Sequence, residues 1–244
     1  MEFLNYFSLF FNILNLNSIF PCLRLCGTLL ANWGKGRECA VAVVKLGEER
    51  RDKLLKAAQR AMAEHGTAVR LNQVAEEAGL TSGAILYHYP DLQDLLTDAT
   101  RAVSERFYDE RLIASESVGD PAARLIMMVK SGLPLDVHDE GVKLLCALGG
   151  AAPRHPIYAV LLTSLYDRQV SLYQSILDTG AALGKFTLSS STLNISRNIV
   201  SLEDAYGYRM MAGHSRIDYD TAVELILDYA RLVTNNPLLE HSPL

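Results

Sequence analysis

Residues 81–88 place hydroxyl, aromatic and imidazole groups in one run that is suited to contacting DNA. The positions that we single out are Thr81, Ser82, Gly83, Ala84, Tyr87 and His88. Hydroxyl groups exchange hydrogen bonds with base edges or phosphates, and an alanine methyl packs against the methyl group of thymine. Gly83 would let the backbone approach DNA or a neighbouring helix closely. Three interpretations of His88 stay open: a base reader, a phosphate contact or a packing residue.

The positive charge near this run is concentrated at one end. Residues 48–98 contain six Lys or Arg against nine Asp or Glu, and five of the six bases precede residue 61. Phosphate contacts supply most sequence-independent affinity for DNA, so we predict such contacts for Arg50, Arg51, Lys53 and the sixth base, Arg70. The net charge of the chain is −5, so any basic footprint must be local. A solvated helix face is the alternative for each of these residues.

Four helices would position these residues. Apolar residues at three- and four-residue spacing predict a first helix over 51–65. A short helix over 71–78 ends at Gly79, a second short helix follows the N-cap Thr81, and Asp91 begins a longer one. Two short helices joined by a glycine-centred turn and packed on a longer helix form a helix-turn-helix, whose second short helix can enter a major groove.

The sequence of this region resembles the TetR family of bacterial repressors. Residues 73–96 read QVAEEAGLTSGAILYHYPDLQDLL, and the family has an Ala-Gly-Val-Ser turn, a Gly-Thr-Leu-Tyr recognition helix and a Lys-Glu-x-Leu start to the fourth helix at the same spacing. The similarity extends over about fifty residues. It implies a DNA-binding domain over 48–98 that binds a double-stranded operator.

Three positions depart from the family pattern. The aromatic residue that usually touches phosphate falls on Leu86, with Tyr87 one place later. The lysine usual at the start of the fourth helix is Leu92, and the threonine pair that usually caps the second helix is Val69-Arg70. The resemblance therefore implies the fold more firmly than the individual DNA contacts.

The rest of the chain also has helical periodicity. We predict five further helices, over 121–133, 139–151, 156–183, 190–213 and 219–235. No stretch alternates long enough to predict a strand. The predicted fold class is therefore all-α, with the N-terminal helix-turn-helix domain followed by a larger helical effector-binding and dimerisation domain over 99–236 and a C-terminal tail over 237–244.

The last two helices each have a broad apolar face, formed by Ile195, Ile199, Leu202, Ala205, Tyr206 and Met210 and by Ala222, Val223, Leu225, Ile226, Tyr229 and Leu232. In the TetR family such a pair meets its two-fold copy in a four-helix bundle, so the resemblance implies a homodimer. Packing within the subunit is the alternative for each residue.

Polarizable and amphipathic side chains in the second domain could line a pocket for a small-molecule effector. The candidates are Met127, Met128, His138, Cys146, His155, Tyr158, Tyr166 and Tyr173. Each of them could equally be an ordinary core residue. The segment 181–186, Ala-Ala-Leu-Gly-Lys-Phe, also resembles a turn in the C-terminal domain of TetR proteins of the choline-responsive BetI type.

Residues 1–47 differ in composition from the rest of the chain. Residues 3–30 are rich in Phe, Leu, Ile and Asn. A signal peptide would have a basic residue before its apolar run, and these residues have none. Four asparagines interrupt the run, which disfavours a membrane span. We interpret residues 1–47 as a non-native or disordered extension. The four cysteines show no CxxC spacing, and we expect no metal and no cofactor.

These observations favour a cytoplasmic, homodimeric repressor that a small molecule releases from its operator. An all-helical enzyme is one alternative, against which the chain has no HExxH motif, no GxSxG motif and no carboxylate–histidine array at helical spacing. A membrane-tethered helical sensor that uses residues 3–23 is the other alternative, although we expect no membrane contact.

Overall fold

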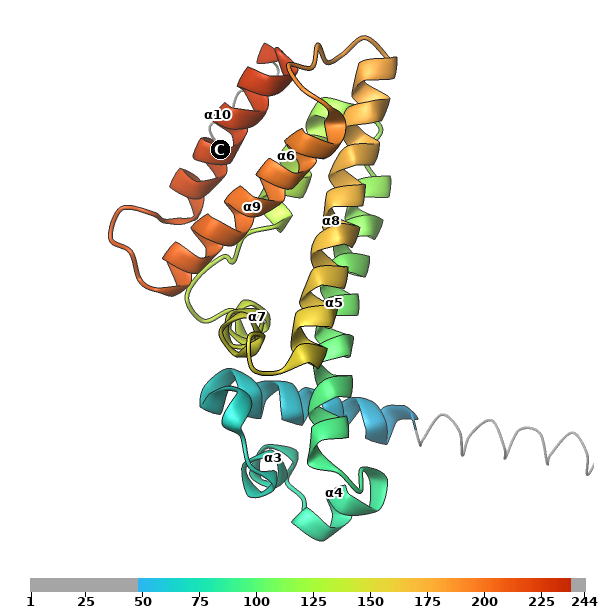
Figure 1. The fold of residues 1–244 in the computed structure, drawn as a ribbon, viewed down its shortest axis with the longest axis vertical. Helices are drawn as coiled ribbons and strands as arrows, with labels where there is room; N and C mark the ends of the chain where they lie inside the picture. Colours follow the sequence, from blue (N-terminus) through green and yellow to red (C-terminus); the bar gives the residue numbers. More distant parts are fainter. Residues whose placement is uncertain (1–47, 238–244) are drawn as a thin grey trace, which may run out of the picture. The chain divides into compact units, whose positions relative to one another are not determined.

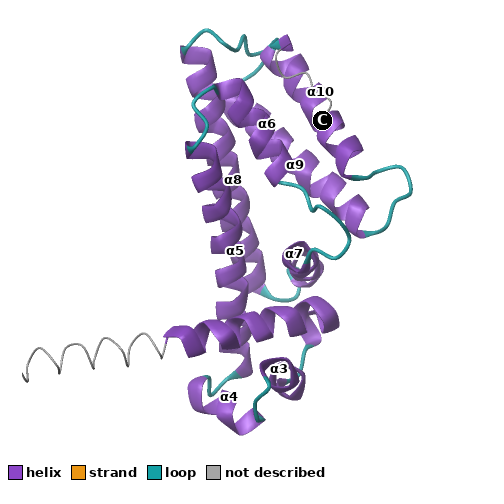
Figure 2. Ribbon diagram, turned by 180° about the vertical axis from the view of Figure 1, so that it is seen from behind, coloured by secondary structure: helices purple, strands orange, loops and turns teal. Residues whose placement is uncertain are grey.

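The structure is a computed structural model that describes residues 48–237. The chain divides into two units, residues 1–52 and 53–244, and the fold is described for the second. The predicted extension over 1–47 lies outside the described residues, as does nearly all of the tail over 237–244. Within the described residues the secondary structure is helical, without strands, as predicted (Figures 1 and 2).

The helices agree with the sequence prediction to within about two residues at most ends. A helix over 48–65 is followed by η2 (Gly66–Ala68), α3 (Leu71–Ala78), α4 (Ser82–His88), α5 (Leu92–Glu116), α6 (Pro121–Ser131), α7 (Glu140–Ala151), α8 (Pro156–Ala182), α9 (Thr192–Met211) and α10 (Tyr219–Thr234). The short helix η2 was not predicted. Helix α5, the helix predicted to follow Asp91, continues as far as Glu116.

Local hydrogen bonds determine where α3 and α4 begin and end. Gly79 ends α3 in the left-handed conformation with φ of 64°, which a glycine adopts without steric cost. The hydroxyl of Thr81 accepts a hydrogen bond from the backbone N–H of Ala84 at 3.2 Å and so caps α4. The carboxylate of Asp91 caps α5 in the same way, through the N–H of Gln93 at 2.8 Å. The predicted turn and caps are confirmed.

One hydrophobic cluster holds the helix-turn-helix together. Its fully buried members include Met62 of the first helix, Val74 of α3, Ile85 of α4 and Leu95 of α5. The cluster also takes in Leu144, Leu148 and Ala151 of α7 and Tyr158 of α8. The helix-turn-helix and the second domain therefore share a hydrophobic core.

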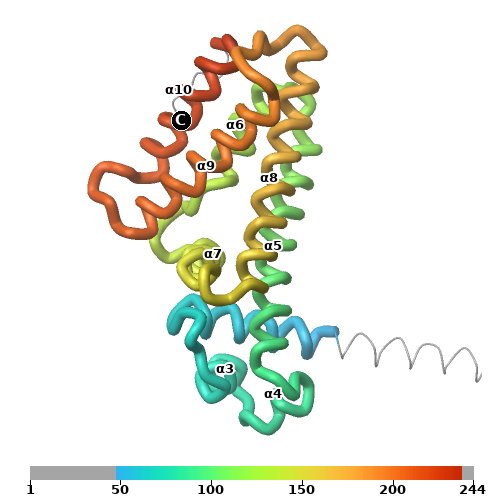
Figure 3. The backbone as a smooth tube through the Cα atoms, in the orientation of Figure 1, coloured from blue at the N-terminus to red at the C-terminus, as the bar shows by residue number. Residues whose placement is uncertain are grey.

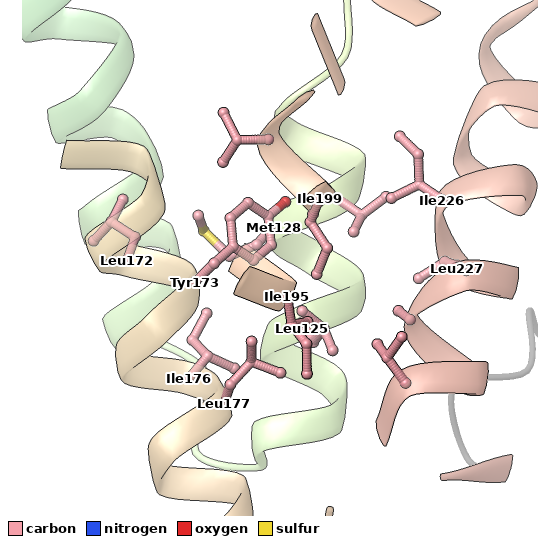
Figure 4. Close-up of a cluster of buried hydrophobic side chains, with 14 of the residues drawn as sticks. Leu125, Met128, Leu172, Tyr173, Ile176, Leu177, Ile195, Ile199, Ile226 and Leu227 are labelled. Carbon is pink, nitrogen blue, oxygen red and sulfur yellow. The ribbon is translucent and has the colours of Figure 1, made fainter. Parts of the chain in front are cut away.

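A second cluster forms the interior of the larger domain, between α6, α8, α9 and α10 (Figure 4). Residues of the predicted apolar faces of α9 and α10 lie here and are buried within the subunit: Ile195, Ile199, Met210, Ala222, Val223 and Ile226. Leu225 and Leu232 stay exposed, at 38% and 77%. The predicted dimer face was thus too wide, because much of the apolar surface of these helices is needed for the core of one subunit.

Helix α5 contributes to both clusters. Its first half supplies Leu95, Leu96, Ala99 and Val103 to the helix-turn-helix core, and farther along Leu112 packs against the core of the larger domain. Figure 3 shows this helix running without a break from the end of α4 to the region of α6 and α8. It crosses residue 98, where the sequence placed the end of the DNA-binding domain, so this boundary lies within a continuous helix.

The turn after α8 depends on close contact between a glycine and an aromatic ring. A Cβ atom at Gly180 would overlap the ring of Phe186, which is 4% exposed. The backbone N–H groups of Lys185 and Phe186 both donate to the carbonyl of Gly180, at 2.8 and 3.1 Å. The ring therefore closes over the last turn of α8.

We expect Gly180→Ala to lower the free energy of unfolding by about 1 to 3 kcal/mol, because the added methyl must displace the Phe186 ring from a packed core. Gly150→Ala is the matched control: this glycine is also helical, has open space at its Cβ position, and should gain up to about 1 kcal/mol of helix propensity. Urea unfolding of the two variants would test the contrast, and equal effects would contradict it.

Candidate DNA-binding and effector sites

Helix α4 exposes the side chains that the sequence assigned to DNA contact. The ring of Tyr87 is 85% exposed, and His88 beside it is also exposed, with its ring edge-on to Tyr87 at 5.2 Å between centroids. Thr81 and Gly83 are exposed, and Ser82 and Ala84 are partly so. By contrast, Ile85 is fully buried, and Tyr89 is 9% exposed with its hydroxyl donating to Asp98 at 3.1 Å. One face of α4 thus anchors the helix, and the other face is presented to solvent.

The predicted phosphate contacts are on the surface. Lys53 and Arg70 are exposed in the second unit. Arg50 and Arg51 are exposed as well, but they belong to the unit over 1–52 and are not placed relative to α4. Arg60, a base of the first helix, instead forms an ion pair with Glu77 of α3 at 2.8 Å and donates to the carbonyl of Glu77 at 3.1 Å. Its charge therefore serves to join two helices.

The larger domain contains a cavity of about 340 Å³ between α5, α7, α8 and α9. Two of the predicted effector contacts, Cys146 of α7 and Tyr166 of α8, line it. The other polar or aromatic side chains that line it are Phe107, Gln169, Glu203, Asp204 and Tyr208. None of these was predicted from the sequence.

The remaining predicted effector residues lie elsewhere. Met128 and Tyr173 are buried in the core of the larger domain, against which Met127 packs. Tyr158 is buried in the other cluster, where its hydroxyl accepts a hydrogen bond from Gln93 at 3.2 Å. His155 precedes α8 and its ring packs against Tyr158, and His138 is exposed in the loop before α7.

A buried charged group lies against the cavity. The guanidinium of Arg111 on α5 donates through Nη2 to Glu203 Oε1 of α9 at 2.8 Å, to the hydroxyl of Tyr173 on α8 at 3.2 Å and to the carbonyl of Met128 at 2.9 Å. The Tyr173 hydroxyl donates to the same carboxylate oxygen. Arg111 and Glu203 are 2% and 3% exposed. A Cβ atom at Gly132 would overlap the Glu203 carboxylate, so this glycine makes room for the pair.

Burial and charge act against each other in this group. Burial tends to lower the pKa of Arg111, but the charge of Glu203 and the hydrogen bonds outweigh burial and raise it. Burial raises the pKa of Glu203, although Arg111 and Tyr173 oppose that shift. Burial likewise raises the pKa of Asp204, against the opposing effect of Arg111. Buried charges of this kind persist only where partners and hydrogen bonds compensate them.

Comparison with known proteins agrees with this architecture. Residues 54–99 match the family described as bacterial regulatory proteins, tetR family. A search of curated protein sequences gave no significant match. In the described residues, no helix combines the length and apolar character that a membrane crossing requires; residues 3–23, on which the membrane-tethered alternative depends, lie outside them.

Several solved structures have the same fold. A protein from Saccharomonospora viridis described as a transcriptional regulator, in complex with choline, is 22% identical, with a TM-score of 0.69 over 75% of this chain and 96% of that one. A TetR transcription regulator from Haloarcula marismortui is 21% identical, with a TM-score of 0.69 over 76% and 98%. The fatty acid degradation regulator FadR from Bacillus halodurans is 20% identical, with a TM-score of 0.59 over 74% and 96%.

The buried pair should show strong coupling. We expect Arg111→Met or Glu203→Met alone to cost about 3 to 5 kcal/mol, because each leaves an uncompensated buried charge. The double variant should cost less than the sum of the two, and less than either one if the methionines pack well. Urea unfolding of the four proteins would measure this, and additive losses would show that the pair is not coupled.

The helix-turn-helix and the surrounding helices agree with the family match and with the fold of the solved structures. Residues 54–99 thus match the TetR family of bacterial regulatory proteins, and the described chain has the fold of solved transcriptional regulators, among them the TetR regulator from Haloarcula marismortui.

Proposed function

We propose that this protein is a homodimeric transcriptional repressor of a bacterial cytoplasm, and that a small molecule in the cavity lowers its affinity for a DNA operator. The observation that carries the proposal is the two-sided packing of α7. Leu144 and Leu148 of this helix are buried in the helix-turn-helix core, while Leu145, Cys146 and Gly149 line the cavity. A molecule that fills the cavity therefore presses on a helix that also supports the DNA-reading module.

Release requires that the effector bind two conformations with different affinity. A cavity that is filled by α7 in one conformation and by ligand in the other meets this requirement, because packed cores switch between discrete arrangements rather than deform continuously. The choline in the similar structure from Saccharomonospora viridis supports a small-molecule role for a domain of this fold. The similarity of residues 181–186 to the BetI type stays a prediction.

The exposure of α4 supports the proposed DNA contacts of Tyr87 and His88. Alanine in place of Tyr87 or His88 should leave unfolding within about 0.5 kcal/mol of the parent protein, because both side chains are exposed. It should weaken specific operator binding by roughly five- to a hundredfold, the range of a lost base contact. Gel shifts on the DNA that flanks the protein's own gene would measure the loss.

The control is a pair of changes in the first described helix. Replacement of Arg50 and Arg51 by Ala should weaken binding to specific and random DNA alike, and it should reduce the salt dependence of binding. If both classes of change weakened binding to the two DNAs in the same proportion, the division into base-reading and phosphate-contacting residues would be wrong.

Dimerisation is proposed through the exposed side of α9 and α10. Leu225 and Leu232 lie seven residues apart, so they share one side of α10, and Leu202 and Tyr229 are partly buried beside the core. Reading two half-sites requires two copies of α4 at a fixed spacing. A two-fold interface would cover the exposed leucines of both copies.

Leu225→Glu should give a folded monomer that no longer binds the operator, because a carboxylate would be desolvated twice in each dimer. Ile226→Glu, at the adjacent position, is the matched control and should unfold the subunit, since Ile226 is fully buried within it. Light scattering, circular dichroism and gel shifts would separate the two results. A monomeric Leu225→Glu protein that kept full operator affinity would overturn the dimer model.

A further inference from the structure

The lining of the cavity is acidic and aromatic. Its charged residues are two carboxylates, Glu203 and Asp204 of α9; no Lys, Arg or His is among the described residues that line it. Three aromatic side chains also reach it, Phe107 of α5, Tyr166 of α8 and Tyr208 of α9. Aromatic faces attract cations through their quadrupole, and two carboxylates repel an anion. The lining therefore favours a ligand with a positive charge.

Glu203 has one oxygen that the protein does not satisfy. Oε1 accepts hydrogen bonds from Arg111 and Tyr173, whereas Oε2 is buried and has no hydrogen-bond partner. The residue as a whole is 3% exposed and borders the cavity. A buried carboxylate oxygen without a partner is unfavourable, so a donor or a cation that reached Oε2 from the cavity would remove a cost that the protein alone leaves.

We infer that the cavity binds a small organic cation, such as a substituted ammonium ion, between Glu203 Oε2, Asp204 and the three aromatic side chains. The inference rests on the proposed function only where it concerns release from DNA. Asp204 keeps an exposed face while it borders the cavity, so it would attract the cation from solvent. Glu203 would hold the cation at depth.

The same carboxylate links the cavity to α5. Glu203 ties α9 to α5 through Arg111, and α5 carries Leu95, Leu96 and Ala99 in the helix-turn-helix core. A cation beside Oε2 shares the negative charge of Glu203 and repels the guanidinium, which weakens the ion pair. Arg111 keeps its hydrogen bonds to Met128 and Tyr173, but these partners are neutral, and its Nε and Nη1 atoms are buried without a partner. A weakened ion pair therefore leaves the guanidinium poorly compensated and favours a shift of α5. Binding of the cation would therefore loosen α5 and favour release of the operator.

The test uses the full chain and three chloride salts: tetramethylammonium, tetraethylammonium and phenyltrimethylammonium. Calorimetric titration should show saturable binding of at least one of them at constant ionic strength, and binding should raise the melting temperature. The neutral alcohol 3-ethylpentan-3-ol, which has three ethyl groups on an uncharged carbon, should bind at least tenfold more weakly than tetraethylammonium. If no salt bound, or if the alcohol bound equally well, the inference would be wrong.

Two variants connect binding to the carboxylates. Asp204→Asn should weaken binding of the best probe by roughly five- to tenfold, whereas Asp178→Asn, which removes an exposed carboxylate of α8 away from the cavity lining, should leave it unchanged. Glu203→Gln should abolish binding. If that variant does not fold, the comparison of Asp204→Asn with Asp178→Asn decides alone, and equal affinities in those two variants would refute the site.

Gel shifts with the same probes separate this inference from the proposed function. If the protein binds the cations through Glu203 and Asp204 but binds no DNA, the cation site is supported and the repressor function is refuted. If the protein binds its operator and a neutral or anionic compound releases it, while the cations have no effect, the repressor function is supported and the cation site is refuted.

Discussion

The ion pair between Arg111 and Glu203 links four helices of the larger domain. Two charges that are almost completely buried recover their desolvation cost only with good geometry and additional hydrogen bonds. Here α5 supplies the guanidinium, α9 the carboxylate and α8 the phenol of Tyr173, and α6 contributes the carbonyl of Met128. The absence of a side chain at Gly132 leaves space for the carboxylate. Because these contacts must form together, the pair fixes the register of four helices in a way that interchangeable apolar contacts cannot.

Helices α5 and α7 connect the packing of the larger domain to that of the helix-turn-helix. Helix α5 carries Arg111 in its second half and Leu95, at 0% exposure, in the helix-turn-helix core. Helix α7 buries Leu144 in the same core and turns Cys146 toward the cavity. The two domains share one hydrophobic core at this junction. A change in packing around the cavity would therefore also change the packing of the helix-turn-helix. This shared core is the physical basis on which the proposed effector site would be coupled to the proposed DNA-binding helix.

Local sequence signals predicted the helix-turn-helix well, because the information there is local. Gly79 needs a left-handed backbone, and Thr81 and Asp91 need only the next few N–H groups to cap a helix. The buried pair was missed, because Arg111 and Glu203 are 92 residues apart and their pairing depends on the tertiary fold. A signal existed nonetheless: Glu203 continues the four-residue spacing of the buried residues Ile195 and Ile199, where a charge needs a partner. Met128 and Tyr158 were selected for their chemistry, yet they pack in the two cores.

The distribution of charge in the helix-turn-helix explains why this protein should depend on assembly. Residues 48–98 have nine acids against six bases, and one of those bases, Arg60, is already paired with Glu77 to hold α3 on the first helix. Few cations are left for phosphates, and the exposed face of α4 contributes hydroxyl, phenol and imidazole groups instead. Sequence-independent affinity, which grows with the number of neutralised phosphates, should therefore be small for one subunit. Two α4 helices held at the spacing of a half-site pair would add their base contacts without adding non-specific affinity in the same proportion. A module with more acids than bases would therefore gain discrimination from the proposed dimerisation. The same weakness would make the proposed release easy, since a modest shift of α5 or α7 in each subunit of a dimer would change the spacing of the two α4 helices at once.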